Sequence, residues 1–325
     1  MSGILALVEH DAGRPDRLSL EALALAGDLA GRLGVGVEAV VIGAGAEAVA
    51  GSLGAYGVST AHVVRHDRLD AYAPMAWASA LGGVIAAGGY DAVITAGSER
   101  GTEVLAHVAA RTGLPLAANV VGVDLGERWT VTRQRWAGSL LEEAWLDGTP
   151  HLLTVAPHGV PASEPDPAAQ PAAVQQVTPE LTDADMRVRV ARTVPAATDR
   201  ISLTDAKVVV GGGRGIGSSE GFAMLEELAT LLGGAIGVSR VATSLGWRPH
   251  AEQIGQTGAR IAPDLYIACG ISGAIQHIVG CKSAKRILVI NKDPEAPIFG
   301  RATYAVVGDV HAIVPAITAE IRRTS

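Results

Sequence analysis

Residues 262–280 read APDLYIACGISGAIQHIVG, and this stretch decides the fold of the second half of the chain. Leu265 to Cys269 is a short apolar run between turn residues, which is typical of a buried strand. Behind the glycine that follows, Ser272 can cap a short helix. A strand, a glycine turn and a helix N-terminus together present backbone N–H groups that attract anionic ligand groups, phosphate above all. A plain strand-to-helix connection is the alternative, and spacing alone does not separate the two.

Length and composition favour a two-domain α/β protein. The chain has 325 residues, long enough for two domains, and 48% of them are hydrophobic, which suits parallel sheets covered by helices. The net charge of −7 argues against a protein that holds nucleic acid through its overall field. Cys269 and Cys281 are too few for a metal site or a disulfide framework, so we expect a reducing compartment and no metal.

The N-terminus carries no basic region or cleavage site ahead of a predicted strand at Ile4 to Val8. Apolar runs are interrupted by charge or glycine before they reach about 18 residues, the length that spans a membrane. We therefore expect a cytoplasmic protein that is not inserted in a membrane.

Residues 1–195 alternate predicted strands with predicted helices, which calls for a mainly parallel sheet with right-handed crossovers. Ser19 is a candidate N-cap for the first helix, and Gly34 should end it. Trp129 to Arg135 alternates with period two and predicts an antiparallel piece at the sheet edge. The other predicted strands are Ile4 to Val8, Val37 to Ile42, His62 to Val64, Ala92 to Thr95 and Leu152 to Val155, and the helices are Ser19 to Leu33, Ala46 to Leu53, Pro74 to Ala87 and Thr102 to Arg111.

No phosphate loop of recognisable spacing occurs in this first domain. Two glycine turns, Gly43 to Glu47 and Gly97 to Gly101, follow predicted strands at positions where ligands could bind. For both, an ordinary turn at the start of a helix is the favoured interpretation.

Prolines crowd the chain between Pro157 and Pro195, so residues from about 157 to 180 should form an extended connector. Val188 to Val194 alternates and could return as one more strand of the first domain. Residues 196–205 are the expected hinge, and residues 206–325 the second domain.

The second domain should be a doubly wound parallel sheet. Its predicted strands are Ala206 to Val210, Ala235 to Val238, Leu265 to Cys269, Ile287 to Ile290 and Tyr304 to Val307; its helices are Glu220 to Leu232 and Val310 to Arg322, with Pro315 expected to kink or restart the last. Turns just beyond the carboxyl ends of parallel strands share one edge of a sheet, where such folds hold their ligand. One extended cofactor could touch all of these turns, which are Gly211 to Gly217, Ser239-Arg240, Gly270 to Gln276, Asn291 and Gly308-Asp309.

The glycine run Gly211 to Gly217 does not fit a GxGxxG register, and it lacks the lysine of a P-loop. The second strand ends in Ser239-Arg240, where a nicotinamide site would want a carboxylate for the ribose. A phosphate turn at the glycine run remains plausible, whereas NAD-dependent hydride transfer and ATP hydrolysis lose support.

Three short segments near the C-terminus resemble a known family: Gly270 to His277, Asn291 to Phe299, and Val307-Gly308-Asp309. They resemble the FAD-binding signature of the electron-transfer flavoprotein α-subunit family. The resemblance runs from about Lys207 to the C-terminus and continues more weakly through the first half. It implies an FAD-binding second domain, a structural and docking first domain, and AMP or a second FAD in a partner β subunit. Ala137-Gly138-Ser139 departs from the family, which usually has asparagine after the glycine.

The resemblance also assigns cofactor-binding residues. It places Arg240 and His277 near the pyrimidine side of the flavin ring, and Gln256 and Thr257 beside its N5 edge. Arg214, Ser239, Ser272, Gly273, Asn291, Asp309 and Val310 match positions that hold the ribityl chain, pyrophosphate and adenosine, and Ile254, Gly255, Ala274, Ile275 and Gln276 complete the expected set.

Arg240 has a physical role in that reading. A flavin that relays electrons singly needs its half-reduced, anionic form stabilised, and a unit charge about 4 Å away is worth roughly 4 kcal/mol at an effective dielectric of 20. His277 could tune the potential with pH. By themselves, Arg240 is typical of a surface helix start, His277 of a packed side chain, and Asp309 of a helix N-cap.

No nucleophile, base and orienting group assemble in the sequence, which favours an electron carrier over an enzyme with its own substrate pocket. The resemblance implies a β-subunit partner, flavoprotein dehydrogenases such as those acting on acyl-CoA in fatty acid β-oxidation as donors, and a membrane quinone oxidoreductase as acceptor. The alternatives are a nicotinamide-dependent oxidoreductase and a binding module that holds a nucleotide as structural filler. A bifurcating member of the same family is not distinguished from an ordinary carrier.

Overall fold

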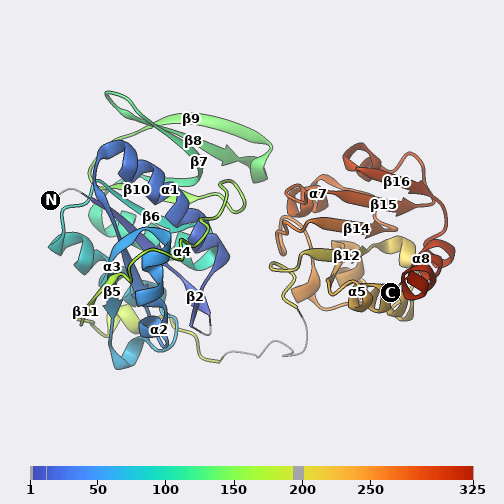
Figure 1. Ribbon diagram of the computed structural model, residues 1–325, viewed down its shortest axis with the longest axis horizontal. Coiled ribbons are helices and arrows are strands. Elements are labelled where there is room, and N and C mark those ends of the chain that lie inside the picture. The colour runs from blue at the N-terminus through green and yellow to red at the C-terminus, as the bar shows by residue number, and fades with distance from the viewer. Residues whose placement is uncertain (1–2, 12, 193–200, 325) are drawn as a thin grey trace. The chain divides into compact units, whose positions relative to one another are not determined.

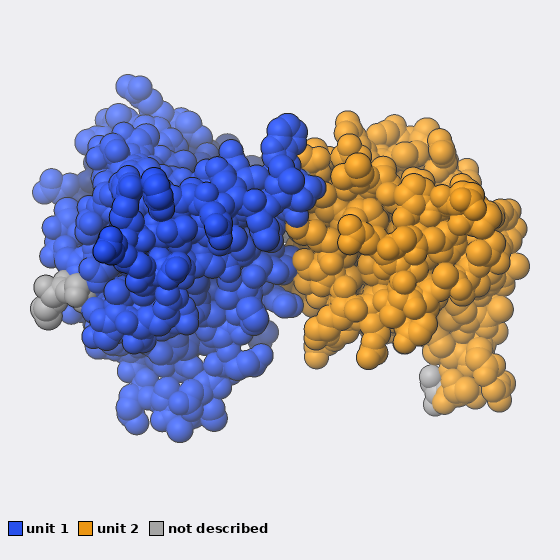
Figure 2. All heavy atoms as spheres, turned by 90° about the horizontal axis from the view of Figure 1, so that it is seen from above, with its two compact units in different colours: residues 1–194 blue, residues 195–325 orange. Residues whose placement is uncertain are grey.

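The computed structural model describes residues 3–11, 13–192 and 201–324, and the chain divides into two compact units, residues 1–194 and residues 195–325 (Figure 2). The first half of the expected hinge, residues 196–200, lies outside the described residues. Leu203, farther along, packs against the core of unit 2. In the described part of the chain, no helix is long and apolar enough to cross a bilayer.

Unit 1 is built on a nine-stranded sheet in the order β11-β5-β4-β1-β6-β10-β7-β8-β9 (Figure 1). Neighbouring strands are parallel from β11 to β7, and β8 and β9 add an antiparallel extension at one edge, which confirms the prediction for Trp129 to Arg135. The strands are β1 (Gly3–Val8), β4 (Gly36–Ile42), β5 (Val58–Val64), β6 (Ala92–Ala96), β7 (Leu116–Leu125), β8 (Trp129–Arg135), β9 (Leu140–Leu146), β10 (His151–Val155) and β11 (Ala173–Val177), with a small pair β2 (His10–Asp11) and β3 (Arg14–Pro15) outside the sheet.

Helices cover both faces of this sheet, because the central strands are apolar on both sides. Ile4 of β1 belongs to the core under α1, whereas its neighbour Leu5 belongs to the core under α3 and α4. The helices are α1 (Arg17–Leu33), α2 (Ala46–Ala50), α3 (Pro74–Ala87) and α4 (Glu99–Thr112), and the short 3₁₀ segments are η1 (Gly51–Tyr56), η2 (Asp67–Leu69), η3 (Trp136–Gly138) and η4 (Ala184–Met186).

Of the two predictions for the ends of α1, the N-cap is wrong and the C-terminal glycine is confirmed. Asp16, not Ser19, caps the helix, because its Oδ1 accepts a hydrogen bond from Leu18 N at 2.8 Å. Ser19 is buried in the first turn, where its Oγ accepts from Glu9 N. Gly34 ends the helix in the left-handed conformation, as expected.

The proline-rich connector contains a strand that the sequence did not predict. β11 pairs in parallel with β5 and so covers an edge that would otherwise be open. The expected strand at Val188 to Val194 is not present among its described residues, 188–192, and residues 193 and 194 lie outside the described chain. The side chains of Val188 and Val190 are exposed, so their alternation buries no face.

Unit 2 is a five-stranded parallel sheet in the order β13-β12-β14-β15-β16, which confirms the doubly wound prediction. The helices α5 and α8 cover one face and α7 the other. The strands are β12 (Val208–Gly212), β13 (Ala235–Val238), β14 (Leu265–Cys269), β15 (Ile287–Asn291) and β16 (Tyr304–Val307); the helices are α5 (Ala223–Leu231), α6 (Arg240–Ser244), α7 (Ile275–Cys281) and α8 (Val310–Thr324), with 3₁₀ segments η5 (Arg214–Ile216), η6 (Glu220–Phe222), η7 (His250–Glu252) and η8 (Pro297–Arg301). Helix α8 does not restart at Pro315 but continues through it.

Candidate functional site

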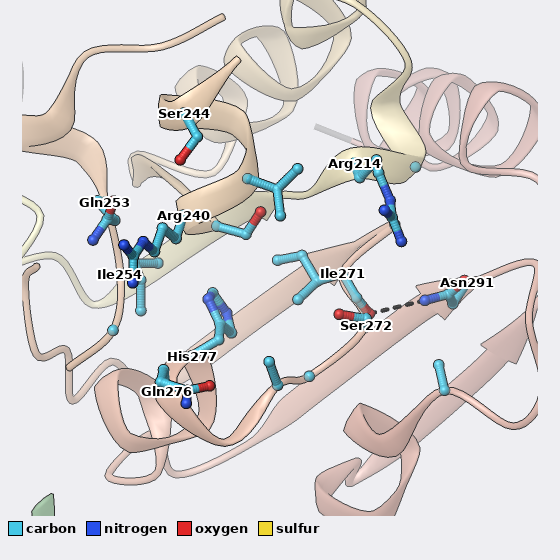
Figure 3. Close-up of a pocket in the computed structure, with 18 of the residues that line it drawn as sticks. Arg214, Arg240, Ser244, Gln253, Ile254, Ile271, Ser272, Gln276, His277 and Asn291 are labelled. Atoms are coloured by element: carbon cyan, nitrogen blue, oxygen red, sulfur yellow. Dashed lines mark hydrogen bonds between the residues drawn. The ribbon is translucent and has the colours of Figure 1, made fainter. Parts of the chain in front are cut away.

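A cavity of about 580 Å³ lies at the carboxyl edge of the unit 2 sheet (Figure 3). The strand order reverses between β12 and β14, and the loops after both strands contribute to its wall, as a doubly wound fold predicts for a ligand site. All predicted binding residues except Ile275, Asp309 and Val310 line it. Gly215, Gly270 and Ile271 also line it, and they belong to turns that were expected to touch a cofactor. The lining residues that the sequence did not predict are Val241, Ser244, Leu245, Gln253, Asp293 and Ala296.

The glycine run after β12 brings two loops together instead of forming a phosphate turn. Gly213 N donates to Cys269 O at 3.0 Å, and Gly215 N donates to Gly270 O at the same distance. A Cβ atom on Gly213 would stand 2.4 Å from Gly270 O. Because these two N–H groups are already bonded, neither of them is available to a phosphate. The run instead sets Arg214 at the edge of the cavity.

The loop after β14 is the part of the site that presents free backbone donors. The N–H groups of Ser272, Gly273 and Ala274 make no hydrogen bond to other described residues. Asn291 Nδ2 fixes the loop by donating to Ile271 O at 2.8 Å. Ser272 does not cap α7, which begins after Ala274 without a side-chain cap; its side chain lines the cavity instead.

Two exposed arginines, Arg214 and Arg240, line the cavity from different loops (Figure 3). Arg240 is the first residue of α6, and only Ser239 separates it from β13. Within the part of the chain that the structure describes, neither guanidinium has a carboxylate within ion-pair distance. Two unpaired cations beside free N–H groups favour an anionic ligand.

His277 lines the cavity from α7 and is buried. Its Nε2 lies 2.8 Å from the hydroxyl of Tyr266. Burial lowers the pKa of His277 to about 4, a shift that the backbone of Ile254 only partly offsets. The ring is therefore neutral near pH 7, so the expected tuning by its protonation is not supported around neutrality. Its Nδ1 is buried without a well-formed hydrogen bond to any described residue.

The loop from Ile254 to Thr257 forms another wall, and its backbone is tied to α7 because Gln256 N donates to Gln276 O at 2.8 Å. Gln253, just before it, is buried and hydrogen-bonded to Thr257. No sequence pattern predicted a role for this glutamine, since its burial depends on contacts between segments. Apolar side chains, among them Ile254, Ile271 and Leu245, complete the wall. The cavity thus offers an apolar surface next to cations and donors.

Three predicted residues lie outside the cavity. Asp309 caps α8 by accepting from His311 N at 3.0 Å, and it pairs with Lys292 at 2.9 Å. Val310 is buried in the core under α8, and the side chain of Ile275 is 74% exposed. In unit 1, Gly43 to Glu47 borders a smaller cavity of about 210 Å³, and Ser98 of the second glycine turn is the N-cap of α4.

Comparison with known proteins agrees with this architecture. Residues 4–182 match the family model described as "Electron transfer flavoprotein domain", and residues 202–282 match "Electron transfer flavoprotein FAD-binding domain". The chain is 36% identical over 324 residues to the electron transfer flavoprotein subunit alpha of Bacillus subtilis (strain 168), covering 98% of this chain and 97% of that protein. It is 39% identical over 337 residues to the subunit alpha of Mycobacterium tuberculosis, covering 99% of each.

Both compact units are matched by the family's own domains, and the relatives align along nearly their whole length. The chain belongs to the electron transfer flavoprotein alpha-subunit family, whose role is electron transfer.

Proposed function

We propose that this chain is the FAD-carrying α subunit of a heterodimeric electron-transfer flavoprotein. It accepts electrons from flavoprotein dehydrogenases, such as those acting on acyl-CoA in fatty acid β-oxidation, and passes them to a membrane quinone oxidoreductase. The observation that carries the proposal is the convergence of two unpaired arginines and an unbonded N–H loop on one cavity.

The residues of the cavity fit FAD. Its volume of about 580 Å³ falls in the range of cofactor sites, which is roughly 300–1,000 Å³. Arg214 and the N–H groups of Ser272 to Ala274 suit a pyrophosphate. The ring of His277 lines the cavity, where its Nδ1, which makes no well-formed hydrogen bond to a described residue, suits a carbonyl or ring nitrogen of a flavin. When bound, FAD supplies reversible electron transfer at its isoalloxazine ring.

Arg240 is the residue we assign to tuning the potential. A charge about 4 Å from the ring is worth between about 1 kcal/mol in bulk water and about 4 kcal/mol at an effective dielectric of 20. The guanidinium is exposed, so solvent screening favours the lower part of this range. His277 contributes a neutral ring that holds a hydrogen bond without adding charge.

Unit 1 supports a partner chain. Its antiparallel extension, strands β8 and β9, lies at one edge of the sheet (Figure 1). Large apolar side chains are exposed on β9 and in the turn before it, and exposed apolar surface marks interaction sites. We assign this surface to the β subunit, which would hold AMP or a second FAD, and the complex to the cytoplasm. The exposed residues are Trp136, Leu140, Leu141 and Trp145.

Coexpression with the β subunit tests the proposal. The purified complex should be yellow, with the absorption bands of oxidised flavin. Arg240→Gln should retain FAD and lower its potential by about 50 mV or more. Arg286→Gln is the control, because Arg286 precedes β15 at the opposite edge of the same sheet. A colourless complex, or an equal shift in both variants, would contradict the proposal.

A further inference from the structure

We propose that Gln253 is a positioning residue that fixes the direction of the Thr257 hydroxyl, so that its proton points into the cavity. The inference rests on the proposed function, in which Thr257 lies beside the redox ring. It assigns to Gln253 a role that is exerted through the Thr257 hydroxyl.

Gln253 is 2% exposed and lines the cavity (Figure 3). It joins helix α6 to the loop that carries Thr257. Its Nε2 lies 3.0 Å from Thr257 Oγ1 and 3.2 Å from Thr257 O. Its Oε1 accepts a hydrogen bond from Thr243 Oγ1 at 2.7 Å. The three side chains therefore form a continuous chain from α6 to the loop that carries Thr257.

The orientation of the Gln253 amide follows from its surroundings. The carbonyl of Thr257 can only accept a hydrogen bond, so the group that faces it at 3.2 Å must be the NH₂ of the amide. The reverse orientation would set two carbonyl oxygens against each other in a buried place, which is costly. The amide oxygen is thus left for Thr243.

This orientation determines the role of the Thr257 hydroxyl. Since Gln253 Nε2 donates to Thr257 Oγ1, that oxygen is an acceptor, and its own proton must turn toward another partner. Thr257 lines the cavity, so the proton is available on the cavity side. A hydroxyl with a fixed donor direction needs no reorganisation when it meets an acceptor atom of a ligand.

The chain of hydrogen bonds also connects Thr257 to the helix of Arg240. Thr243 lies one turn beyond Arg240 in α6, and its Oγ1 is 2.9 Å from Arg240 O as well as 2.7 Å from Gln253 Oε1. With one proton to give, Thr243 serves the shorter contact while it remains within reach of the helix backbone. These hydrogen bonds thereby fix the position of the Thr257 hydroxyl relative to the helix that carries Arg240.

The test replaces Gln253 by methionine, which keeps the length of the side chain and removes the amide. In the complex with the β subunit, Gln253→Met should retain FAD. A hydroxyl that donates a hydrogen bond to a ring nitrogen opposes the protonation of that nitrogen on full reduction. Loss of the fixed hydroxyl direction should therefore raise the affinity for reduced FAD relative to oxidised FAD about tenfold. This corresponds to a rise in the two-electron potential of about 30 mV. Thr257→Ala should shift the potential in the same direction. Gln253→Met should then add nothing further in the Thr257→Ala background.

Gln170→Met is the matched control, because Gln170 is an exposed glutamine of unit 1, and it should leave the potential unchanged. A flavin-independent readout is a double-mutant cycle on urea unfolding of the chain, in which Gln253→Met and Thr257→Ala should couple by up to tenfold in the unfolding equilibrium constant. An unshifted potential, an equal shift in the Thr257→Ala background, or no coupling in unfolding would overturn the inference. A wild-type complex without flavin would overturn the proposed function and the role of Gln253 with it, while the cycle would still report the hydrogen bond.

Discussion

In each unit of the chain the order of the parallel strands reverses beside the first strand of the sheet, and these two reversal points differ in what fills them. In unit 1 the reversal lies between β1 and β6, and in unit 2 between β12 and β14. Doubly wound folds bind ligands at this position, so both units present the same opportunity. The comparison shows that topology offers a site, whereas the residues just beyond the strands decide whether it stays open.

Unit 1 fills the position with its own carboxylate. Glu9 directly follows β1, and its Oε1 accepts a hydrogen bond from the hydroxyl of Ser98, the N-cap of α4. Ser98 Oγ in turn accepts from Gly101 N at 2.8 Å. A half-buried acid therefore lies at the helix N-terminus, where a ligand phosphate could otherwise bind.

Unit 2 has no acid at the corresponding place. Glycines follow both strands and pack against each other. Farther along the loop after β14, the N–H groups of Ser272 to Ala274 make no hydrogen bond to other described residues. The cations beside it, Arg214 and Arg240, have no described carboxylate partner. We call the cavity side of the unit 2 sheet the open edge, because backbone N–H groups and the charges of Arg214 and Arg240 form it. We call the reversal point of unit 1 the closed edge, because the side chain of Glu9 takes the place of a ligand there.

The largest effect should come from disturbing the backbone of the open edge. Gly273 has a φ of +83°, and a Cβ atom there would stand 2.5 Å from Ile298 N. Gly273→Ala combines a strained backbone with a clash against backbone, so we expect a loss of about 3 kcal/mol or more in the free energy of unfolding of unit 2. Urea unfolding followed by circular dichroism measures this.

Gly300→Ala is the control for that substitution, since nothing lies within 4 Å of a Cβ atom at Gly300. It should change the free energy of unfolding by less than about 1 kcal/mol. If Gly273→Ala were equally mild, the loop after β14 would not depend on glycine. The backbone conformation of that loop would then not distinguish the unit 2 site from unit 1.

The next effect concerns His277 and depends on pH. Burial lowers its pKa from the ordinary 6.5 to about 4, so the unfolded chain binds a proton that the folded chain does not between these pH values. Stability therefore falls as the pH drops from 6.5 to 4, by about 3 kcal/mol for this group. His277→Gln should remove that part of the pH dependence of urea unfolding.

His250→Gln provides the comparison for the histidine, because His250 is exposed in the same unit. This variant should keep the full acid sensitivity of the wild-type chain. An unchanged pH profile in His277→Gln would mean that the open edge does not bury this ring in its neutral form.

The sequence predicted the elements whose causes are local. Helix α3 has the bounds Pro74–Ala87 that proline at its first position and glycine after its last residue indicate. Convergence of the turns in unit 2 was also predictable, because parallel strands bring their carboxyl ends to one edge. Those features require only the order and spacing of residues along the chain.

What the sequence did not show depends on contacts between distant segments. The strand β11 is mostly exposed, and it exists because the edge of β5 accepts an extended segment. Gln253 acquires its place from Thr243 and Thr257 together. Gly213 looked like part of a phosphate turn, but its N–H is bonded to β14, a pairing visible only in three dimensions.

The smallest effect should come from neutralising the acid of the closed edge. Burial raises the pKa of Glu9, and the hydrogen bond from Ser98 opposes this only in part. The wild-type chain thus holds the proton more tightly when folded, and the stability from this group is lost as the pH rises through the raised pKa. Glu9→Gln cannot ionise, so it should equal the wild type at low pH and gain on it as the pH rises, by on the order of 1 kcal/mol in urea unfolding.

Glu99→Gln, at an exposed position of the first turn of α4, should show little of this dependence on pH. If Glu9→Gln instead lost stability as the pH rose, the ionised carboxylate would be the favoured form at the helix N-terminus, and its attraction to the N–H groups would exceed the cost of burial. Unit 1 would then hold a true internal anion at its reversal point. In that case the two edges would share one preference for negative charge and differ only in whether the chain or a ligand supplies it.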